Sequence, residues 1–260
     1  MINISYKYII IIIIIIIFFF SIYTNLKELF SNNGIYTAVI VEPREHKALE
    51  FVLVNFLTLL DERFNFIIFH GTKNETYLDN ILNSKLKNHL HRITKINLNV
   101  DNLQIYEYNN LLVNKEMFYD KIPTEYFLIF QTDTIICSKN KDYIYDFINK
   151  NYDYVGAPWV HINNLVGNGG LSLRKKSKML EIIKKINYEN QNEDIYFSFG
   201  CYTLNCNMPS MVEAKKFSVE SIYSDDTFGI HSAWKLLNES DIAVINNNCD
   251  GLNELIKLNK

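Results

Sequence analysis

The chain lacks any block of basic residues. Its 26 Lys and Arg residues are spread along 260 positions and are balanced by 29 Asp and Glu, which gives a net charge of −3. Because nucleic-acid binding needs a basic patch or stripe, nucleic acid is excluded as a partner. With 48% hydrophobic and 21% charged residues, the composition is globular rather than disordered, and the length allows one large domain or two small ones.

Cysteine is also scarce, and Cys137, Cys201, Cys206 and Cys249 are the only four in the chain. No pair has C-x-x-C spacing and no His flanks them at zinc-site spacing, which argues against a structural zinc site. Two interpretations stay open. Either the thiols are buried and free, or Cys201 and Cys206 form a disulfide if the domain faces an oxidising compartment.

Glycine, proline and tryptophan are rare, with 9, 4 and 2 copies, yet they gather in one segment. Four of the glycines, one proline and one tryptophan lie between Gly156 and Gly170. Glycine permits positive φ and lets the backbone approach a ligand closely. The cluster therefore indicates a binding loop, with an ordinary tight turn as the alternative.

The one long hydrophobic run lies at the N-terminus, where nine consecutive isoleucines occupy residues 9–17. With its apolar neighbours, and with Lys7 snorkelling, the run approaches the roughly 20 residues needed to cross a bilayer. A cleaved signal peptide is the alternative, but no A-x-A-like site follows. The sequence therefore predicts a membrane location, with a single-pass anchor over 1–24, a linker over 25–34 and one domain over 35–260.

Beyond the linker, β-branched and aromatic runs alternate with stretches of helical periodicity. Strands are predicted over 36–42, 64–70, 93–98 and 126–130, and helices over 45–60, 75–90, 109–119 and 175–186. This alternation predicts an α/β sandwich with a mostly parallel central sheet. Ligands bind such sheets at the carboxyl ends of the strands, and Asp133 follows one of these ends.

Two polar features come after the last predicted strand. In Gln131-Thr132-Asp133, the carboxylate either binds a divalent cation or is a turn or capping Asp. The segment from Gly167 to Gly170 offers backbone N–H groups to an anionic or hydroxylated ligand, helped by the start of the helix expected after it.

Two more polar features follow further along the chain. Asn192 precedes Glu193 and Asp194 at a predicted helix start, where acids either complement the helix dipole or include a general base. His231 is either structural or a metal ligand, and the nearby Trp234 can stack on a sugar ring.

In their order, these segments resemble a glycosyltransferase-like family of domains of unknown function. The resemblance covers roughly residues 36–234 and is carried by the motifs QTD, DYVGAPW, GNGGLSLR, ED and GIH. The earlier segments Val41–His46 and Phe69–Gly71 also fit. The same order is similar to that of GT-A nucleotide-sugar glycosyltransferases, in which a D-x-D metal motif precedes a glycine loop, an x-E-D motif and a C-terminal His.

The resemblance implies a role for each matching residue. Asp133 and His231 would bind Mn²⁺ or Mg²⁺, and Asp194 with Glu193 would form the catalytic acid motif. Gln131 stands where D-x-D has its first Asp, which puts metal dependence in doubt. The residues implied to bind donor or acceptor are Glu42, Arg44, Trp159, Asn168, Gly169, Gly170 and Trp234.

The implied protein is a membrane-anchored glycosyltransferase with a GT-A-like three-layer α/β fold. It would move a sugar from a nucleotide donor, by analogy a UDP-sugar, to a glycan, lipid or protein acceptor. In an inverting reaction Asp194 would deprotonate the acceptor hydroxyl, and the helix start is expected to keep this carboxylate ionised. A non-catalytic carbohydrate-binding module and a membrane-tethered interaction protein stay open as alternatives.

Overall fold

The computed structural model describes residues 34–160 and 166–260. The predicted anchor over 1–24 and the linker up to residue 33 lie outside these ranges, so the anchor stays a prediction. Within the described ranges, no helix has both the length and the apolar character needed to cross a bilayer.

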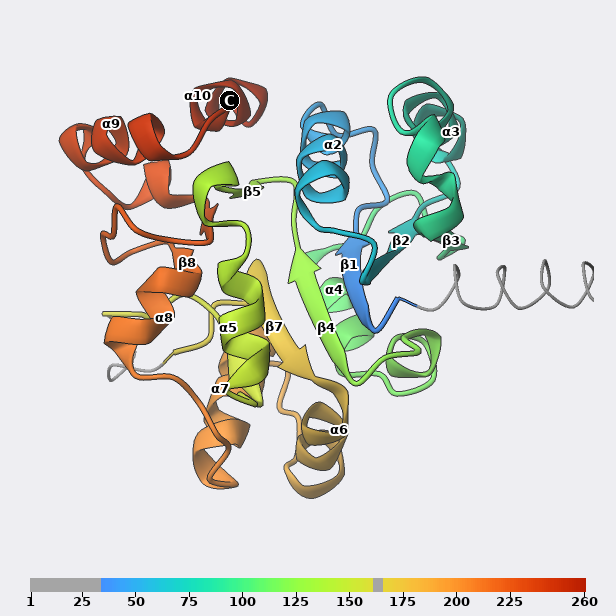
Figure 1. The fold of residues 1–260 in the computed structure, drawn as a ribbon. Helices are drawn as coiled ribbons and strands as arrows, with labels where there is room; N and C mark the ends of the chain where they lie inside the picture. The colour runs from blue at the N-terminus through green and yellow to red at the C-terminus, as the bar shows by residue number, and fades with distance from the viewer. Residues whose placement is uncertain (1–33, 161–165) are drawn as a thin grey trace, which may run out of the picture.

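A six-stranded mixed sheet with the strand order β3-β2-β1-β4-β7-β6 forms the centre of the domain (Figure 1). The first four strands in the chain are parallel, and β7 runs antiparallel to its neighbours β4 and β6. The predicted α/β architecture with a mostly parallel sheet is therefore confirmed. The strands are β1 (Tyr36–Val41), β2 (Phe64–His70), β3 (Ile93–Asn97), β4 (Tyr126–Phe130), β6 (Tyr154–Val155) and β7 (Leu171–Lys175).

Alternate residues of the central strands face opposite sides of the sheet and build two separate cores. In β1, Ala38 and Ile40 face α2 and α3, whereas Val39 and Val41 face α4, α6 and α7. Helices therefore cover both faces, which gives three layers. These helices are α2 (Leu49–Leu59), α3 (Glu75–Ser84), α4 (Ile105–Leu112), α6 (Lys176–Lys185) and α7 (Glu193–Thr203).

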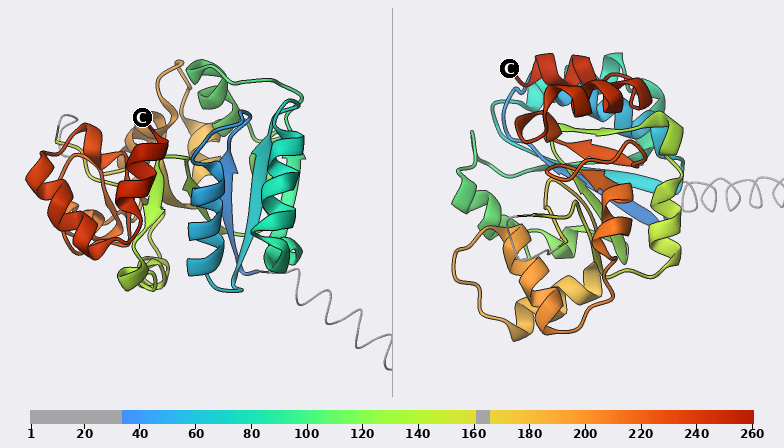
Figure 2. Two further views of the ribbon diagram at one scale, coloured as in Figure 1. Left: turned by 90° about the horizontal axis from the view of Figure 1, so that it is seen from above. Right: turned by 90° about the vertical axis from the view of Figure 1, so that its left-hand side faces the viewer.

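A second sheet of three strands, in the order β5-β9-β8, continues from the carboxyl end of β4. The C-terminal helices, red in Figure 2, lie on the same side of the main sheet as α2 and α3 and share their core. The remaining elements are β5 (Thr134–Ile136), β8 (Ser218–Val219), β9 (Gly229–His231), α5 (Tyr143–Asn149), α8 (Met211–Phe217), α9 (Glu239–Asn248) and α10 (Leu252–Leu258). Short 3₁₀ helices are η1 (Lys87–Arg92), η2 (Tyr119–Lys121), η3 (Ser138–Asn140) and η4 (Ala233–Lys235).

One predicted helix has wrong bounds, and one strand was not predicted. The helix predicted over 109–119 is α4, which begins earlier because Gln104 and Glu107 form a capping box. The glycine segment leads into strand β7, which was not predicted, and the helix predicted over 175–186 follows that strand as α6. The sequence of β7 alternates Leu171 and Leu173, which face one core, with polar residues on the other side, and this is the period of a strand.

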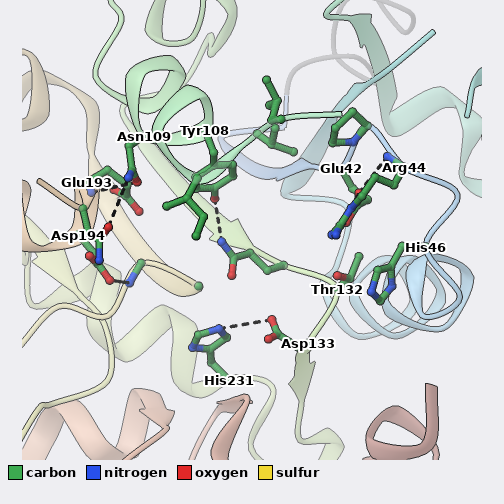
Figure 3. A pocket seen from close by; sticks show the side chains of 18 of the residues that line it. Glu42, Arg44, His46, Tyr108, Asn109, Thr132, Asp133, Glu193, Asp194 and His231 are labelled. Carbon is green, nitrogen blue, oxygen red and sulfur yellow. Dashed lines mark hydrogen bonds and ion pairs between the residues drawn. The ribbon is translucent and has the colours of Figure 1, made fainter. Parts of the chain in front are cut away.

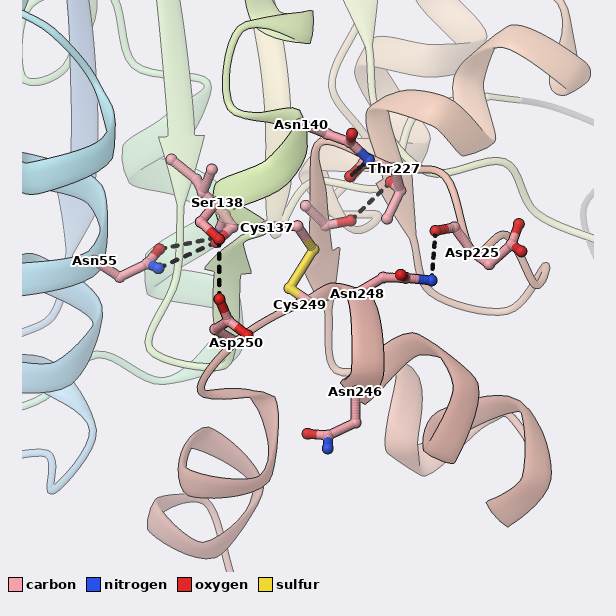
Figure 4. The surroundings of a disulfide bond; sticks show 12 residues. Asn55, Cys137, Ser138, Asn140, Asp225, Thr227, Asn246, Asn248, Cys249 and Asp250 are labelled. Carbon is pink, nitrogen blue, oxygen red and sulfur yellow. Dashed lines mark hydrogen bonds between the residues drawn. A yellow bond between two sulfur atoms is a disulfide. The ribbon is translucent and has the colours of Figure 1, made fainter.

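A disulfide joins Cys137, which follows β5, to Cys249 between α9 and α10 (Figure 4). The alternative pairing predicted from the sequence is wrong, because Cys201 and Cys206 are both free thiols. The bonded cysteines are separated by 112 positions, so only the fold brings them together. The bond attaches the C-terminal helices to the end of β5, the strand that begins directly after Asp133.

We expect the double variant Cys137→Ser/Cys249→Ser to lose about 2–4 kcal/mol of unfolding free energy, because a cross-link over a long loop restricts the unfolded chain. Chemical unfolding with and without a reductant measures this loss. Cys206→Ser, which removes a half-buried free thiol, is the control and should respond to reductant as the unaltered chain does. An unchanged unfolding midpoint in reductant would show that the bond adds no stability.

Candidate functional site

A cavity of about 580 Å³ lies at the carboxyl ends of the parallel strands (Figure 3). This is the edge at which α/β sheets bind ligands. It brings together nine of the residues singled out in the sequence, although they come from segments far apart in the chain. Those residues are Glu42, Arg44, Asp133, Asn168, Gly169, Gly170, Glu193, Asp194 and His231.

In the described part of the chain, neither predicted tryptophan lines this cavity. Trp159 is 3% exposed, and its Nε1 donates to Oε2 of Glu220 at 3.1 Å. Trp234 is half-buried and packs against the core on the α2 side. The expected stacking of these rings on a sugar is therefore not supported, because burial in the fold keeps both out of the cavity.

The pairing of β5 with β9 brings Asp133 beside His231. Thr134 and His231 are register partners, and the backbone N–H of Ser232 donates to the Asp133 carbonyl at 3.0 Å. Nε2 of His231 lies 3.3 Å from Oδ1 of Asp133, and Nζ of Lys235 lies 3.2 Å from Oδ2. One carboxylate thus faces both an imidazole and an ammonium group.

Neighbouring charges set the protonation of this pair. Burial alone would raise the pKa of Asp133, but the hydrogen bond from His231 and the charges of His231 and Lys235 lower it below its usual range. Burial lowers the pKa of His231, whereas Asp133 and Glu220 together raise it to about 9. The imidazole is therefore a cation at neutral pH when no metal is bound.

The same residues fit a divalent cation with two protein ligands. Carboxylate and imidazole groups suit ions such as Mn²⁺, and Oε1 of Glu220 lies 3.3 Å from Nδ1 of His231, on the far side of the ring. The described residues contain no cluster of three or more acidic, His or Cys side chains able to hold a metal. A substrate diphosphate would therefore have to complete the coordination.

The glycine segment packs tightly between α7 and His231. A β-carbon on Gly169 would lie 2.2 Å from Oε1 of Glu193, and one on Gly170 would lie 2.2 Å from Nε2 of His231. At these distances a side chain at either position would force Glu193 or His231 to shift, so the close approach favours glycine. The segment is thus part of the wall of the cavity and not an isolated turn.

Asn168 holds this segment in place from within. Its Oδ1 accepts from the Gly170 backbone N–H at 2.9 Å, and its Nδ2 donates to Oε1 of Glu220 at 2.7 Å. Asn168 is 5% exposed, so these two bonds leave its amide little opportunity to bind a ligand.

A buried ion pair joins β7 to the first turn of α7. Two guanidinium nitrogens of Arg174 lie 2.6 and 3.0 Å from the Glu193 carboxylate, and the two side chains are 0% and 4% exposed. The guanidinium also donates to Ser172 Oγ at 2.9 Å and lies over the rings of Tyr154 and Phe197. Glu193 therefore has both oxygens engaged, which makes it a positioning group and not the predicted catalytic one.

Asp194 is the carboxylate that this arrangement leaves for chemistry. Its Oδ2 accepts from the Gly169 N–H at 3.2 Å and its Oδ1 from the Ile195 N–H at 2.8 Å. Burial and the negative charge of Glu193 nevertheless raise its pKa to about 6. The helix start does not hold this pKa low, because desolvation outweighs the N–H groups, although a carboxylate with this pKa is still mostly ionised at neutral pH, as expected. A carboxylate with this pKa is a stronger base than an ordinary Asp.

Glu42 and Arg44 lie together on the β1 side of the cavity. The backbone N–H, Nε and Nη2 of Arg44 all donate to the Glu42 carboxylate, at 2.9, 2.8 and 2.7 Å. Glu42 is 3% exposed, whereas about half of the Arg44 side chain is accessible. Arg44 is thus held in a fixed direction and still presents charge to the cavity, which His46 also lines.

Sequence reasoning missed several polar side chains that complete the site. Gln131 Nε2 donates to Tyr108 Oη at 2.9 Å, and Asn109 Oδ1 accepts from the Glu193 N–H at 3.2 Å. Tyr108 and Asn109 belong to α4, which begins before the helix predicted over 109–119. No sequence pattern therefore connects these two residues with the site. Lys235 lies four positions after the predicted C-terminal metal ligand, and that proximity is the signal that could have identified it.

Residues 92–231 match the model of DUF5672, a family described as proteins of unknown function. The chain belongs to the DUF5672 family. The matched region of this DUF5672 member contains Asp133, the glycine segment, Asp194 and His231, but not Glu42 or Arg44. No curated protein matches the chain significantly.

Two solved glycosyltransferases have a similar fold to this DUF5672 domain. The mannosyltransferase PcManGT from Pyrobaculum calidifontis, solved with GDP-Man and Mn²⁺, gives a TM-score of 0.50 at 9% identity over 69% of this chain and 55% of its own. The glycosyltransferase GlyE from Streptococcus pneumoniae gives 0.50 at 9% identity over 87% of this chain and 62% of its own. The chain thus spans little more than half the length of these enzymes, and the likeness shows the fold alone.

We expect Arg174→Met to destabilise this DUF5672 domain by about 3–5 kcal/mol, because it leaves the Glu193 carboxylate buried without a partner. Lys185→Met is the control, since it removes an exposed partner of Glu181 and should cost less than about 1 kcal/mol. Urea unfolding measures both. Equal losses in the two variants would contradict the importance of the buried pair.

Proposed function

We propose that this domain is a glycosyltransferase that uses a nucleotide-sugar donor. The observation that carries the proposal is the shared cavity, in which a basic carboxylate, Asp194, and the Asp133–His231 pair are joined by a glycine wall. The GT-A-like fold supports it, because the cavity lies at the ligand-binding edge of the sheet. Membrane attachment through residues 1–24 belongs to the same proposal and has the hydrophobic run as its only support.

The cavity is asymmetric in charge, and the asymmetry suits sugar transfer. Arg44 and Lys235 supply positive charge around Asp133, where a diphosphate would be neutralised. His46 lines the same part of the cavity, but burial lowers its pKa and disfavours its charged form. Asp194 lines another part, next to the glycine wall. The donor diphosphate would lie by the cations, and the acceptor hydroxyl of a glycan, lipid or protein would lie by Asp194.

In an inverting transfer, Asp194 takes the proton of the acceptor hydroxyl while the hydroxyl oxygen attacks the anomeric carbon of the donor sugar. A new C–O bond forms to the acceptor while the C–O bond to the diphosphate breaks. The diphosphate leaves with the electron pair, and Arg44 and Lys235 stabilise its charge. Asp133 and His231 would hold Mn²⁺ or Mg²⁺, which when bound supplies further positive charge for the leaving group.

We expect the purified full-length chain to release nucleotide from at least one UDP- or GDP-sugar. Asp194→Asn should lower kcat by about 10²-fold or more with little change in donor KM, because it removes the base and not the diphosphate site. Asp133→Asn should mainly raise the donor KM. Asp120→Asn, at an exposed Asp paired with Lys115, is the matched control.

Three outcomes would contradict this function. The enzyme proposal fails if no nucleotide is released or bound across UDP-, GDP-, CMP- and dTDP-sugars, with or without Mn²⁺. If the Asp194→Asn variant retains its activity, Asp194 is not the catalytic base. Sugar binding without donor turnover favours the non-catalytic module.

The reaction should also depend on pH through Asp194. Because its pKa is about 6 and only the ionised form accepts a proton, kcat/KM should rise with pH and level off above that value. On the acid side the rise should approach tenfold per unit of pH. A pH–rate profile measures it, with unfolding followed in parallel to exclude acid denaturation. A profile that is flat through pH 6 would contradict Asp194 as the base.

A further inference from the structure

We propose that Glu220 is a positioning residue that holds the His231 imidazole in the orientation needed to bind a divalent cation. The inference depends on the proposed function in one respect, since it takes Asp133 and His231 as the cation site. Glu220 belongs to none of the motifs that the sequence presents. It directly follows β8, and β8 pairs in parallel with β9, the strand that ends at His231.

Glu220 contacts three groups that surround the cavity wall. Its Oε1 lies 3.3 Å from Nδ1 of His231 and accepts from Nδ2 of Asn168 at 2.7 Å. Its Oε2 accepts from Nε1 of Trp159 at 3.1 Å. The Glu220 side chain is only 12% exposed, so these contacts are shielded from water. The carboxylate thus accepts hydrogen bonds from Asn168 and Trp159, and it faces His231 Nδ1 as an ion-pair partner.

The placement of Glu220 decides which nitrogen of His231 is available. With a cation at Nε2, the imidazole would be neutral and keep its proton on Nδ1, which faces Glu220 at 3.3 Å, so that the Nε2 lone pair would be available beside Asp133, 3.3 Å away. Carboxylates that accept from the second nitrogen of a metal-ligating His fix its tautomer and ring orientation and make it a better ligand. Gly170 packs on the other side of the ring, so the imidazole has two supports.

A purely structural role for Glu220 is the competing explanation. Its bonds to Asn168 and Trp159 hold the glycine segment and the chain before it, and both bonds could matter for folding alone. The two roles separate when the bonds are removed one at a time. Trp159→Phe removes the indole donor and keeps the Glu220 charge, whereas Glu220→Gln keeps the size of the side chain and loses the charge that faces His231.

The test is Mn²⁺ binding by the purified full-length chain, measured from the electron paramagnetic resonance signal of free Mn²⁺ with UDP or GDP present. We expect Glu220→Gln to weaken Mn²⁺ binding about 10–100-fold. Glu220→Asp, which retains the carboxylate, should recover part of that loss. Trp159→Phe should stay within about threefold of the unaltered chain, and thermal unfolding of every variant provides the measure of folding.

Weakened Mn²⁺ binding in Glu220→Gln, with Trp159→Phe near the unaltered chain, supports the inference. It is overturned if Glu220→Gln binds Mn²⁺ normally, if Trp159→Phe weakens binding as much, or if the unaltered chain binds no Mn²⁺ with either nucleotide. An unaltered chain that binds Mn²⁺ but releases nucleotide from no sugar donor instead refutes the proposed glycosyltransferase and leaves the role of Glu220 intact.

Discussion

Arg174 and Glu193 meet where water is excluded, and much of the geometry of the site follows from that contact. Burying two charges is unfavourable unless both are fully paired, and here the carboxylate receives two guanidinium nitrogens while aromatic rings flank the cation. The pair fixes the first turn of α7 against β7. Asp194 is the next residue, so its position relative to the glycine wall is set by a bond that it does not itself make. The charge of Glu193 then reaches Asp194 and raises its pKa.

The remainder of the cavity is organised by a second, independent constraint, the pairing of β5 with β9. This pairing aligns Asp133 with His231, and the Cys137–Cys249 bond attaches the C-terminal helices to the same strand. The two constraints meet at Asn168 and Glu220, which connect the glycine wall to His231. Under the proposed function, the base and the diphosphate site have to keep a fixed separation, and this connection would provide it.

The central strands could be predicted because they are buried on both faces and read as continuous apolar runs. Asp133 and Asp194 could be predicted as well, since one follows such a strand and the other opens a helix. Strand β7 was missed because Arg174, a charged residue, lies within it, and its burial depends on a partner 19 positions away. Glu220 and the Cys137–Cys249 pair gave no local signal, because strand pairing and a 112-residue separation bring their partners together. Trp159 was misassigned for a related reason: an indole suits a sugar cleft and a buried hydrogen bond equally well.

Gln131 stands where the D-x-D motif has its first aspartate, and its surroundings give a physical reason for an amide at this position. Its Nε2 donates to Tyr108 Oη, so the side chain is held against α4 without bringing a charge into the cavity. A second carboxylate here would also add negative charge beside Asp133, in a cavity proposed to bind a diphosphate. With an amide at this position, Arg44, Lys235 and His231 face less negative charge from the protein itself. Under the proposed function, more of their positive charge is then available to the leaving diphosphate, and less has to come from a metal ion than in a site with two aspartates.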